Sequence, residues 1–147
     1  MDESLVNVLQ FANENPSSWL ATSEDGKPHV RGMLMWFADE TGFYFHTAKA
    51  KRLYGQMKKN PQVEAAFIRN PTDPVNFETL HVAGIVEMVE DDALLERLKQ
   101  ERPWLWGNME RAGVNTECVI FRIIKGSAYI WNMKWNIKER EIPKVAF

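Results

Sequence analysis

The chain has 147 residues, 45% of them hydrophobic, and a formal net charge of -2 at pH 7. This length predicts one domain spanning residues 1–147, and the charge excludes the broad positive field typical of nucleic-acid-binding proteins. Cys118 is the only cysteine, which excludes an intrachain disulfide and a site with several thiolate ligands.

The start of the chain does not resemble a targeting segment. Met1 to Gln10 carries two acidic residues and no basic one. No apolar run approaches the ~20 residues needed to span a bilayer. We therefore expect a cytoplasmic protein without a membrane partner.

The first third of the chain predicts a helix followed by a β meander. Apolar residues at helical spacing in Leu5–Ala12 indicate an amphipathic helix that ends at Asn15-Pro16. Ser18–Ser23, His29–Phe37 and Phe43–Thr47 have the character of strands and are separated by turn residues. We expect these three strands to pair in sequence order.

The middle of the chain alternates short helices with strands. Ala50–Lys59 is a short basic helix stopped by Asn60-Pro61, and Val63–Arg69 and Thr79–Val89 are strands. A further helix, capped by Asp91 or Asp92, ends before Pro103.

The end of the chain predicts a last hairpin, in which Cys118–Ile124 and Ser127–Asn132 flank Lys125-Gly126. The total is six or seven antiparallel strands and three helices. Strands outnumber helices and pair with their sequence neighbours, which favours a mainly β fold, a closed or nearly closed β-barrel with peripheral helices.

The predicted strand Phe43–Thr47 runs directly into the first turn of the predicted basic helix Ala50–Lys59. A helix start offers unpaired backbone N–H groups, Lys51 and Arg52 add positive charge, and Thr47 adds a hydroxyl. Basic residues in a first turn oppose the helix dipole, and an anionic ligand such as a phosphate monoester would remove that conflict. The alternative is a solvated helix face that carries lysines.

An arginine interrupts the apolar strand Pro28–Met35. Arg31 needs a partner within a sheet, and the following Gly32 permits a planar group to approach the backbone closely. A planar aromatic cofactor would fit there. The alternative is that Arg31 points to solvent or to a neighbouring acid.

Together these segments resemble the pyridoxamine 5′-phosphate oxidase-like family of FMN-binding split barrels. The resemblance covers about Pro16 to Trp131 and rests on an ordered set of segments, namely Pro28–Met35, Thr47–Arg52, Asn60–Glu64 and Val82–Gly84. It implies a homodimer with FMN in a cleft between the two subunits.

The resemblance also implies cofactor-binding residues. On the phosphate and ring side these are Arg31, Gly32, Met33, Leu34, His46, Thr47, Lys51 and Arg52. Thr79 stands where some family members have a glutamine that contacts the ring. Trp131 stands where the family often supplies an aromatic residue from the other subunit, although ordinary packing would also explain it.

The resemblance favours a short, functionally diverse branch of the family. Authentic pyridoxamine-phosphate oxidases end in an Arg/His-containing segment that grips the substrate, and Trp135–Pro143 has a different pattern. We expect a flavoprotein oxidoreductase, related to nitroimidazole-resistance and general-stress flavoproteins, whose small-molecule substrate is a planar nitro-aromatic or quinone-like acceptor. The alternative is a non-enzymatic flavin or haem carrier or sensor.

Two further features carry weaker expectations. His29, His46 and His81 lack metal-ligand spacing, so we expect no metal site. The cluster Trp104–Gly107 is interpreted as core packing or a dimer contact in preference to a lid over the flavin. No catalytic residue is assigned, because a flavin carries the chemistry itself.

Overall fold

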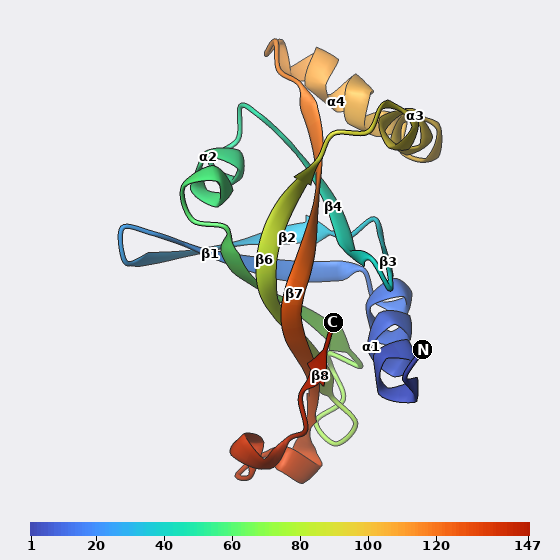
Figure 1. Cartoon of the computed structure of the whole chain (residues 1–147), viewed down its shortest axis with the longest axis vertical. Coiled ribbons are helices and arrows are strands. Elements are labelled where there is room, and N and C mark those ends of the chain that lie inside the picture. Colours follow the sequence, from blue (N-terminus) through green and yellow to red (C-terminus); the bar gives the residue numbers. More distant parts are fainter.

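The computed structural model describes residues 1–147 as one curved antiparallel sheet with helices around it (Figure 1). The strands are β1 (Ser17–Glu24), β2 (Lys27–Leu34), β3 (Phe37–Asp39), β4 (Gly42–Ala48), β5 (Gln62–Arg69), β6 (Glu78–Val89), β7 (Cys118–Asn132) and β8 (Val145–Ala146). The helices are α1 (Glu3–Glu14), α2 (Arg52–Lys59), α3 (Asp92–Glu101) and α4 (Trp104–Ala112), and the 3-10 turns η1 (Met133–Trp135) and η2 (Glu139–Glu141) follow β7. The predicted mainly β class is confirmed, with eight strands instead of six or seven and four α-helices instead of three.

The sheet closes where the chain passes from β2 to β3. The strand order is β2-β1-β5-β6-β7-β4-β3, so β2 and β3 lie at opposite ends of the path. Between them, the Met35 N–H donates to Pro16 O and the Trp36 N–H donates to Tyr44 O, both at 2.9 Å. The chain therefore changes partners within two residues and bridges the split in the barrel.

Two predictions about this region were wrong. His29–Phe37 is not a single strand, because β2 ends at Leu34 and β3 begins at Phe37. The three-stranded meander is also absent, since β4 pairs with β3 and β7 and makes no ladder with β2. Local turn signals located the strands, but long-range pairing decided their order.

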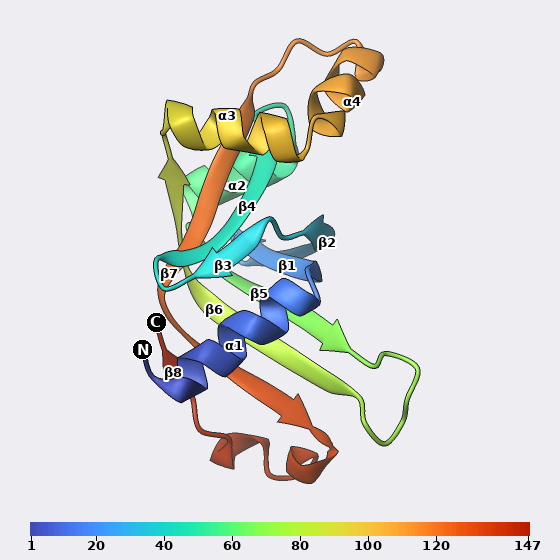
Figure 2. The same ribbon diagram turned by 90° about the vertical axis from the view of Figure 1, so that its right-hand side faces the viewer.

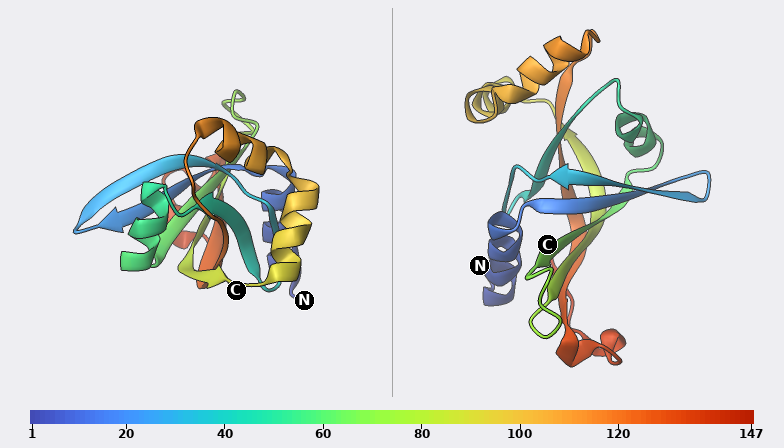
Figure 3. Two further views of the ribbon diagram at one scale, coloured as in Figure 1. Left: turned by 90° about the horizontal axis from the view of Figure 1, so that it is seen from above. Right: turned by 180° about the vertical axis from the view of Figure 1, so that it is seen from behind.

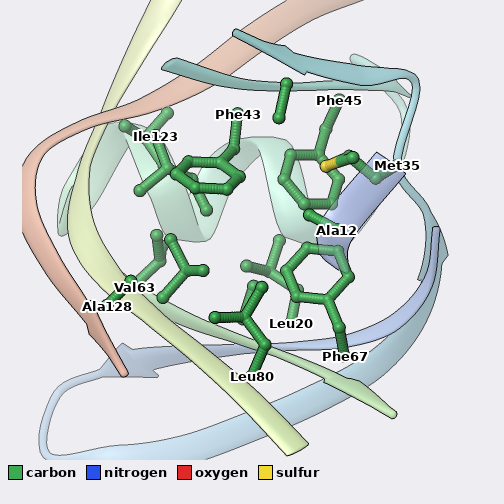
Figure 4. Close-up of a cluster of buried hydrophobic side chains, with 14 of the residues drawn as sticks. Ala12, Leu20, Met35, Phe43, Phe45, Val63, Phe67, Leu80, Ile123 and Ala128 are labelled. Carbon is green, nitrogen blue, oxygen red and sulfur yellow. The ribbon is translucent and has the colours of Figure 1, made fainter. Parts of the chain in front are cut away.

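The barrel core is formed by the inward faces of the strands. Leu20, Phe43, Phe45, Phe67 and Leu80 are fully buried and meet at the centre of the molecule (Figure 4). Helix α1, which lies across the sheet (Figure 2), adds its predicted apolar face to the same cluster. Alternating burial along β1 and β5 matches the period of a half-buried strand.

The predicted last hairpin is instead one long strand with a bulge. β7 pairs with β6 along both halves, and the register shifts where Ala83 pairs with Ser127 but Ile85 pairs with Ile124. A Cβ added at Gly126 would lie 1.8 Å from the Ala83 carbonyl oxygen, so only glycine permits this approach. Lys125-Gly126 marks a close backbone contact and not a turn between strands.

Helices α3 and α4 form an arm at the end of the molecule remote from η1 and η2 (Figure 1). α3 packs on a second, smaller cluster that contains Trp36, Tyr44, Leu98 and Ile120. α4 begins after Pro103 and ends at Gly113, which has the left-handed φ of 67° that favours glycine at a helix end. None of the helices has the length and apolar composition to cross a bilayer.

Candidate functional site

Strands β2 and β4, helix α4 and the segment leading into α2 surround a pocket of about 440 Å³. Its lining residues are Gly32, Met33, Leu34, His46, Thr47, Ala48, Ala50, Lys51, Trp104, Leu105, Asn108, Met109, Ala112, Val114, Thr116 and Cys118. Ten of these are hydrophobic, none is acidic, and Lys51 supplies a cation. A planar apolar ligand with one negative end matches this lining.

Six of the ten predicted cofactor-binding residues line this pocket. They are Gly32, Met33, Leu34, His46, Thr47 and Lys51. A larger hollow of about 810 Å³ lies beside η2, but its lining is mainly charged and polar and contains none of the ten. The pocket between β2, β4 and α4 is therefore the candidate site.

The start of α2 gives the pocket one positively charged end, called here the cationic end, and its charges have no acidic partners. Lys51 is the N-cap residue and no side chain caps the helix, so the N–H groups of Arg52 and Leu53 stay available, while the Tyr54 N–H donates to Lys51 O at 3.2 Å. Neither Lys51 nor Arg52 takes part in an ion pair. The first turn therefore carries two unneutralised positive charges in addition to the helix dipole.

The Thr47 hydroxyl points to a missing partner at this end. Thr47 is only 4% exposed, and its Oγ1 has no hydrogen-bond partner. A buried hydroxyl without a partner is destabilising by about 1–3 kcal/mol. A ligand oxygen that accepts from Thr47 while contacting the cations would remove this penalty.

Arg31 lies against α2 and does not line the pocket. Its guanidinium donates to Leu20 O at 3.2 Å, to Thr22 Oγ1 at 2.9 Å and to Gln56 Oε1. Gln56 follows Arg52 by one helical turn, so Arg31 reaches the same face of α2 as Arg52. Figure 3 shows the β1–β2 hairpin and α2 on the same side of the molecule. All of Arg31's hydrogen-bond partners are neutral, and it takes part in no ion pair.

Burial and a hydrogen bond from Arg102 keep the His46 ring neutral. Arg102 Nη1 donates to His46 Nε2 at 2.7 Å. Burial, together with the charges of Arg102 and Lys51, lowers the pKa of His46 to about 4. Because Nε2 accepts this bond, the neutral ring carries its proton on Nδ1.

The α4 wall was not predicted as a helix. Trp104, Leu105, Asn108, Met109 and Ala112 recur at helical spacing and face the pocket. Two local signals were available for this helix: Pro103 marks its start and Gly113 marks its end. For the cluster Trp104–Gly107, interpreted as core packing or a dimer contact, core packing holds for Leu105 and Trp106, which pack on the cluster beneath α3. Trp104 is instead 47% exposed and lines the pocket, and a dimer contact stays a prediction.

Thr79 and Trp131 lie away from the pocket. They pair with each other across β6 and β7, at the end of the sheet near η1. The Thr79 hydroxyl bonds His81 Nε2 at 2.9 Å, and Trp131 packs edge-on against Phe77. Their predicted roles at the flavin stay predictions.

The outer face of the sheet connects these distant residues to the pocket. Directly paired residues share a face, which places Gly32, Trp19, Ala66 and His81 in one row across β2, β1, β5 and β6. Thr79 and Trp131, two residues further along their strands, lie on that same face. Trp19 is 54% exposed there, so a large apolar side chain lies open on this face next to Gly32 at the pocket edge.

No group of three or more His, Cys, Asp or Glu side chains comes together in a way that would hold a metal ion. The cationic end, the Thr47 hydroxyl and the apolar walls are therefore the chemical features of the site.

Comparisons with known proteins agree with this architecture. The model of the pyridoxamine 5′-phosphate oxidase family matches residues 6–120. The fold is similar to that of a NimC/NimA family protein from Clostridium acetobutylicum, with 21% identity, a TM-score of 0.74, and coverage of 99% of this chain and 94% of that chain. No curated protein matches the sequence.

Two further similar structures carry different ligands in their names. One is an FAD-binding protein from Mesorhizobium loti, with 17% identity, a TM-score of 0.60, and coverage of 87% of this chain and 92% of that chain. The other is the haem storage protein HutZ from Vibrio cholerae, with 18% identity, a TM-score of 0.61, and coverage of 89% and 93%. At these identities the likeness establishes the fold alone.

Proposed function

Since the chain belongs to the pyridoxamine 5′-phosphate oxidase family, we propose that its pocket binds FMN and that the protein is an FMN-dependent oxidoreductase. The family binds flavin, and the split-barrel fold is the one expected for it. The phosphate would lie at the start of α2 and the ring system between β2 and α4. Bound flavin would supply the electron transfer, and the chain's own residues hold and orient it.

The unpartnered Thr47 hydroxyl and the two unneutralised cations at the start of α2, of which Lys51 lines the pocket, carry this proposal. Thr47 Oγ1 is buried without an acceptor or donor, and Lys51 and Arg52 have no acidic partner. A phosphate monoester takes a hydroxyl donor, cationic donors and free helix N–H groups together. A neutral ligand would leave both charges uncompensated.

The apolar end of the pocket supports a planar acceptor. Met33, Leu34, Leu105 and Met109 offer no charge to a substrate, and Trp104 presents an exposed aromatic ring. A small nitro-aromatic or quinone-like compound would pack through its faces against the part of these walls that the flavin ring leaves uncovered. A highly charged substrate would lose its hydration there without compensation.

A second copy of the chain is the partner that we propose for the outer sheet face. Trp19 and Val30 are 54% and 64% exposed, and Leu34 belongs both to this face and to the pocket. Within one chain, Trp131 lies at the far end of the same face. A homodimer formed through this face would cover the apolar surface and bring Trp131 of one copy towards the other copy's pocket. Light scattering after size-exclusion chromatography should give about twice the chain mass, and Trp19→Glu should shift the protein towards the monomer.

The cofactor is tested first on the purified protein. We expect absorption bands near about 375 and about 450 nm, and release of FMN, identified by mass spectrometry, on denaturation. A colourless protein that also fails to bind added FMN would overturn the proposal. Reoxidation of the reduced, FMN-loaded protein by nitro-aromatic and quinone acceptors then tests turnover, which should exceed that of free FMN.

Haem binding has less support than flavin binding. Of the three histidines, only His46 lines the pocket, and its Nε2 already accepts a hydrogen bond from Arg102. His81 is stacked on Tyr129 and bonded to Thr79. An axial ligand to haem iron needs a free imidazole nitrogen. A Soret band in place of flavin bands would reverse this preference.

A further inference from the structure

Arg102 joins three parts of the candidate site through a single side chain. It is the last residue before Pro103 and lies between α3 and α4. Its guanidinium donates to Leu34 O at 3.0 Å, to Met35 O at 2.8 Å and to His46 Nε2 at 2.7 Å. Leu34 and His46 both line the pocket.

The position of this guanidinium follows from the split in the barrel. Leu34 ends β2 and Met35 lies between β2 and β3, so their carbonyl groups are at a point where the chain is changing ladder partners. A backbone carbonyl next to a buried region needs a donor. Arg102 provides donors to both carbonyls, and it takes part in no ion pair.

The backbone of Arg102 also begins α4. Its carbonyl accepts from the Leu105 N–H at 3.1 Å, in the first turn of the helix. No side chain of α4 is buried, and only Leu105 and Trp106 pack against the cluster beneath α3. The arginine therefore ties the strand side of the pocket to a helix that has few attachments of its own.

We propose that Arg102 is a positioning residue, which sets the separation between α4 and the β2–β4 side of the pocket and so determines which acceptors enter. The role in acceptor selection rests on the proposed flavin function. The role in positioning does not, because it follows from the hydrogen bonds alone. Lysine cannot replace Arg102, because one ammonium group lacks the forked geometry that serves three separated acceptors.

The test compares full-length Arg102→Met and Arg102→Lys with the matched control Arg97→Met. Arg97 lies on α3, donates to Glu101 Oε2 at 2.7 Å and stacks over the Trp36 and Phe37 rings, but it does not line the pocket and makes no hydrogen bond to a residue that does. The first readout is hydrogen–deuterium exchange in α4, measured without flavin. We expect about tenfold faster exchange in both Arg102 variants and a change below about twofold in the control.

A second readout follows His46. Removing the Arg102 charge and hydrogen bond should raise the His46 pKa, measured by NMR, above its value of about 4, and Arg97→Met should leave it unchanged. If α4 exchanges at the original rate in both Arg102 variants, the positioning role is overturned. If Arg102→Met does not fold, the lysine variant decides the same question.

Acceptor selection is measured on FMN-loaded protein. Arg102→Met should change the ratio of kcat/KM between a one-ring and a three-ring quinone by about fivefold or more, with a smaller change in kcat alone. An unchanged ratio, with α4 loosened, would overturn the selective role. If the original protein does not bind FMN, the flavin proposal fails, and the exchange measurement still decides whether Arg102 positions α4.

Discussion

Helices α3 and α4 follow each other with only Arg102 and Pro103 between them, yet they are attached very differently. In α3, Leu98 is fully buried, and Glu101 accepts a 2.9 Å hydrogen bond from the Trp36 indole. In α4 no side chain is buried, and Trp104 is 47% exposed. One helix is part of the folded body, whereas the other lies at its edge.

This difference separates the two sides of the pocket. The β2, β4 and α2 side is built on the barrel core, so the groups that would hold a phosphate are fixed when the sheet forms. The α4 side depends on Arg102 and a few partly buried contacts. Binding of the cofactor and access of a second ligand are thus controlled by different parts of the molecule.

The largest effect on stability should come from shortening Leu98, the buried side chain that attaches α3 to the body of the protein. Leu98→Ala removes a fully buried side chain and should lower the free energy of unfolding by about 3 kcal/mol. Leu105→Ala in α4 should lower it by less than about 1 kcal/mol, because that residue is only partly buried. Urea denaturation measures both values. Equal losses would show that the two helices are attached equally well.

The side of the pocket formed by β2, β4 and α2 should provide most of the affinity for the phosphate of FMN. Lys51→Ala with Arg52→Ala should weaken FMN binding by about 2–4 kcal/mol, since each charged hydrogen bond contributes about 1–2 kcal/mol. Lys58→Ala with Lys59→Ala, in the last turn of the same helix, removes the same charge and should leave affinity unchanged. Fluorescence titration with FMN measures both. Similar losses in the two pairs would indicate a general charge effect.

His46, which accepts a hydrogen bond from Arg102 where the two sides of the pocket meet, should make the stability of the protein depend on pH. The pKa of His46 is about 4 in the folded protein, below its ordinary value of 6.5, so the unfolded chain takes up a proton first as the pH falls. The free energy of unfolding should therefore be highest above pH 6.5 and decline down to about pH 4, by at most about 3 kcal/mol from this residue. Urea titrations across this range should show a shallower decline in His46→Gln. An identical pH profile would mean that His46 is not held neutral.

The smallest effect concerns the buried Thr47 hydroxyl, which has no hydrogen-bond partner. Thr47→Val keeps the side-chain shape and removes an unsatisfied group, so stability should stay level or rise while FMN affinity falls by about 1 kcal/mol. Thr22→Val is the control, because its hydroxyl already bonds Arg31 and Gln56, and its loss should lower stability. If Thr47→Val binds FMN normally, Thr47 does not contact the ligand.

Most individual elements were predictable from local patterns. The α1 face and the alternation along β1 and β5 are read directly from apolar spacing. The order of strands was not predictable in this way, because the pairing of β4 with β7 joins residues 70 to 80 positions apart, such as Phe43 with Ile123 and Ala48 with Cys118, and no local turn encodes it. Lys125-Gly126 was misread for a related reason, since a bulge and a turn both use glycine.

The candidate site was predictable at its charged end and less so at its apolar end. Lys51 and Thr47 were recognisable because a basic first turn after a strand conflicts with the helix dipole. Arg102 gave no such signal, because its three acceptors are two backbone carbonyls and a ring brought together only by the closed barrel. The α4 face was visible in the spacing of Leu105, Asn108, Met109 and Ala112, but Gly107 and the two tryptophans obscured it.

The strand order also has a consequence for synthesis on the ribosome. β1, β2, β5 and β6 find ladder partners among residues made shortly before or after them. β4, which carries His46 and Thr47, has only the three-residue β3 beside it until β7 has been translated. The newly made chain thus holds β4 without a long ladder partner while residues 49–117 are translated, and the part of the pocket formed by His46 and Thr47 is ordered late.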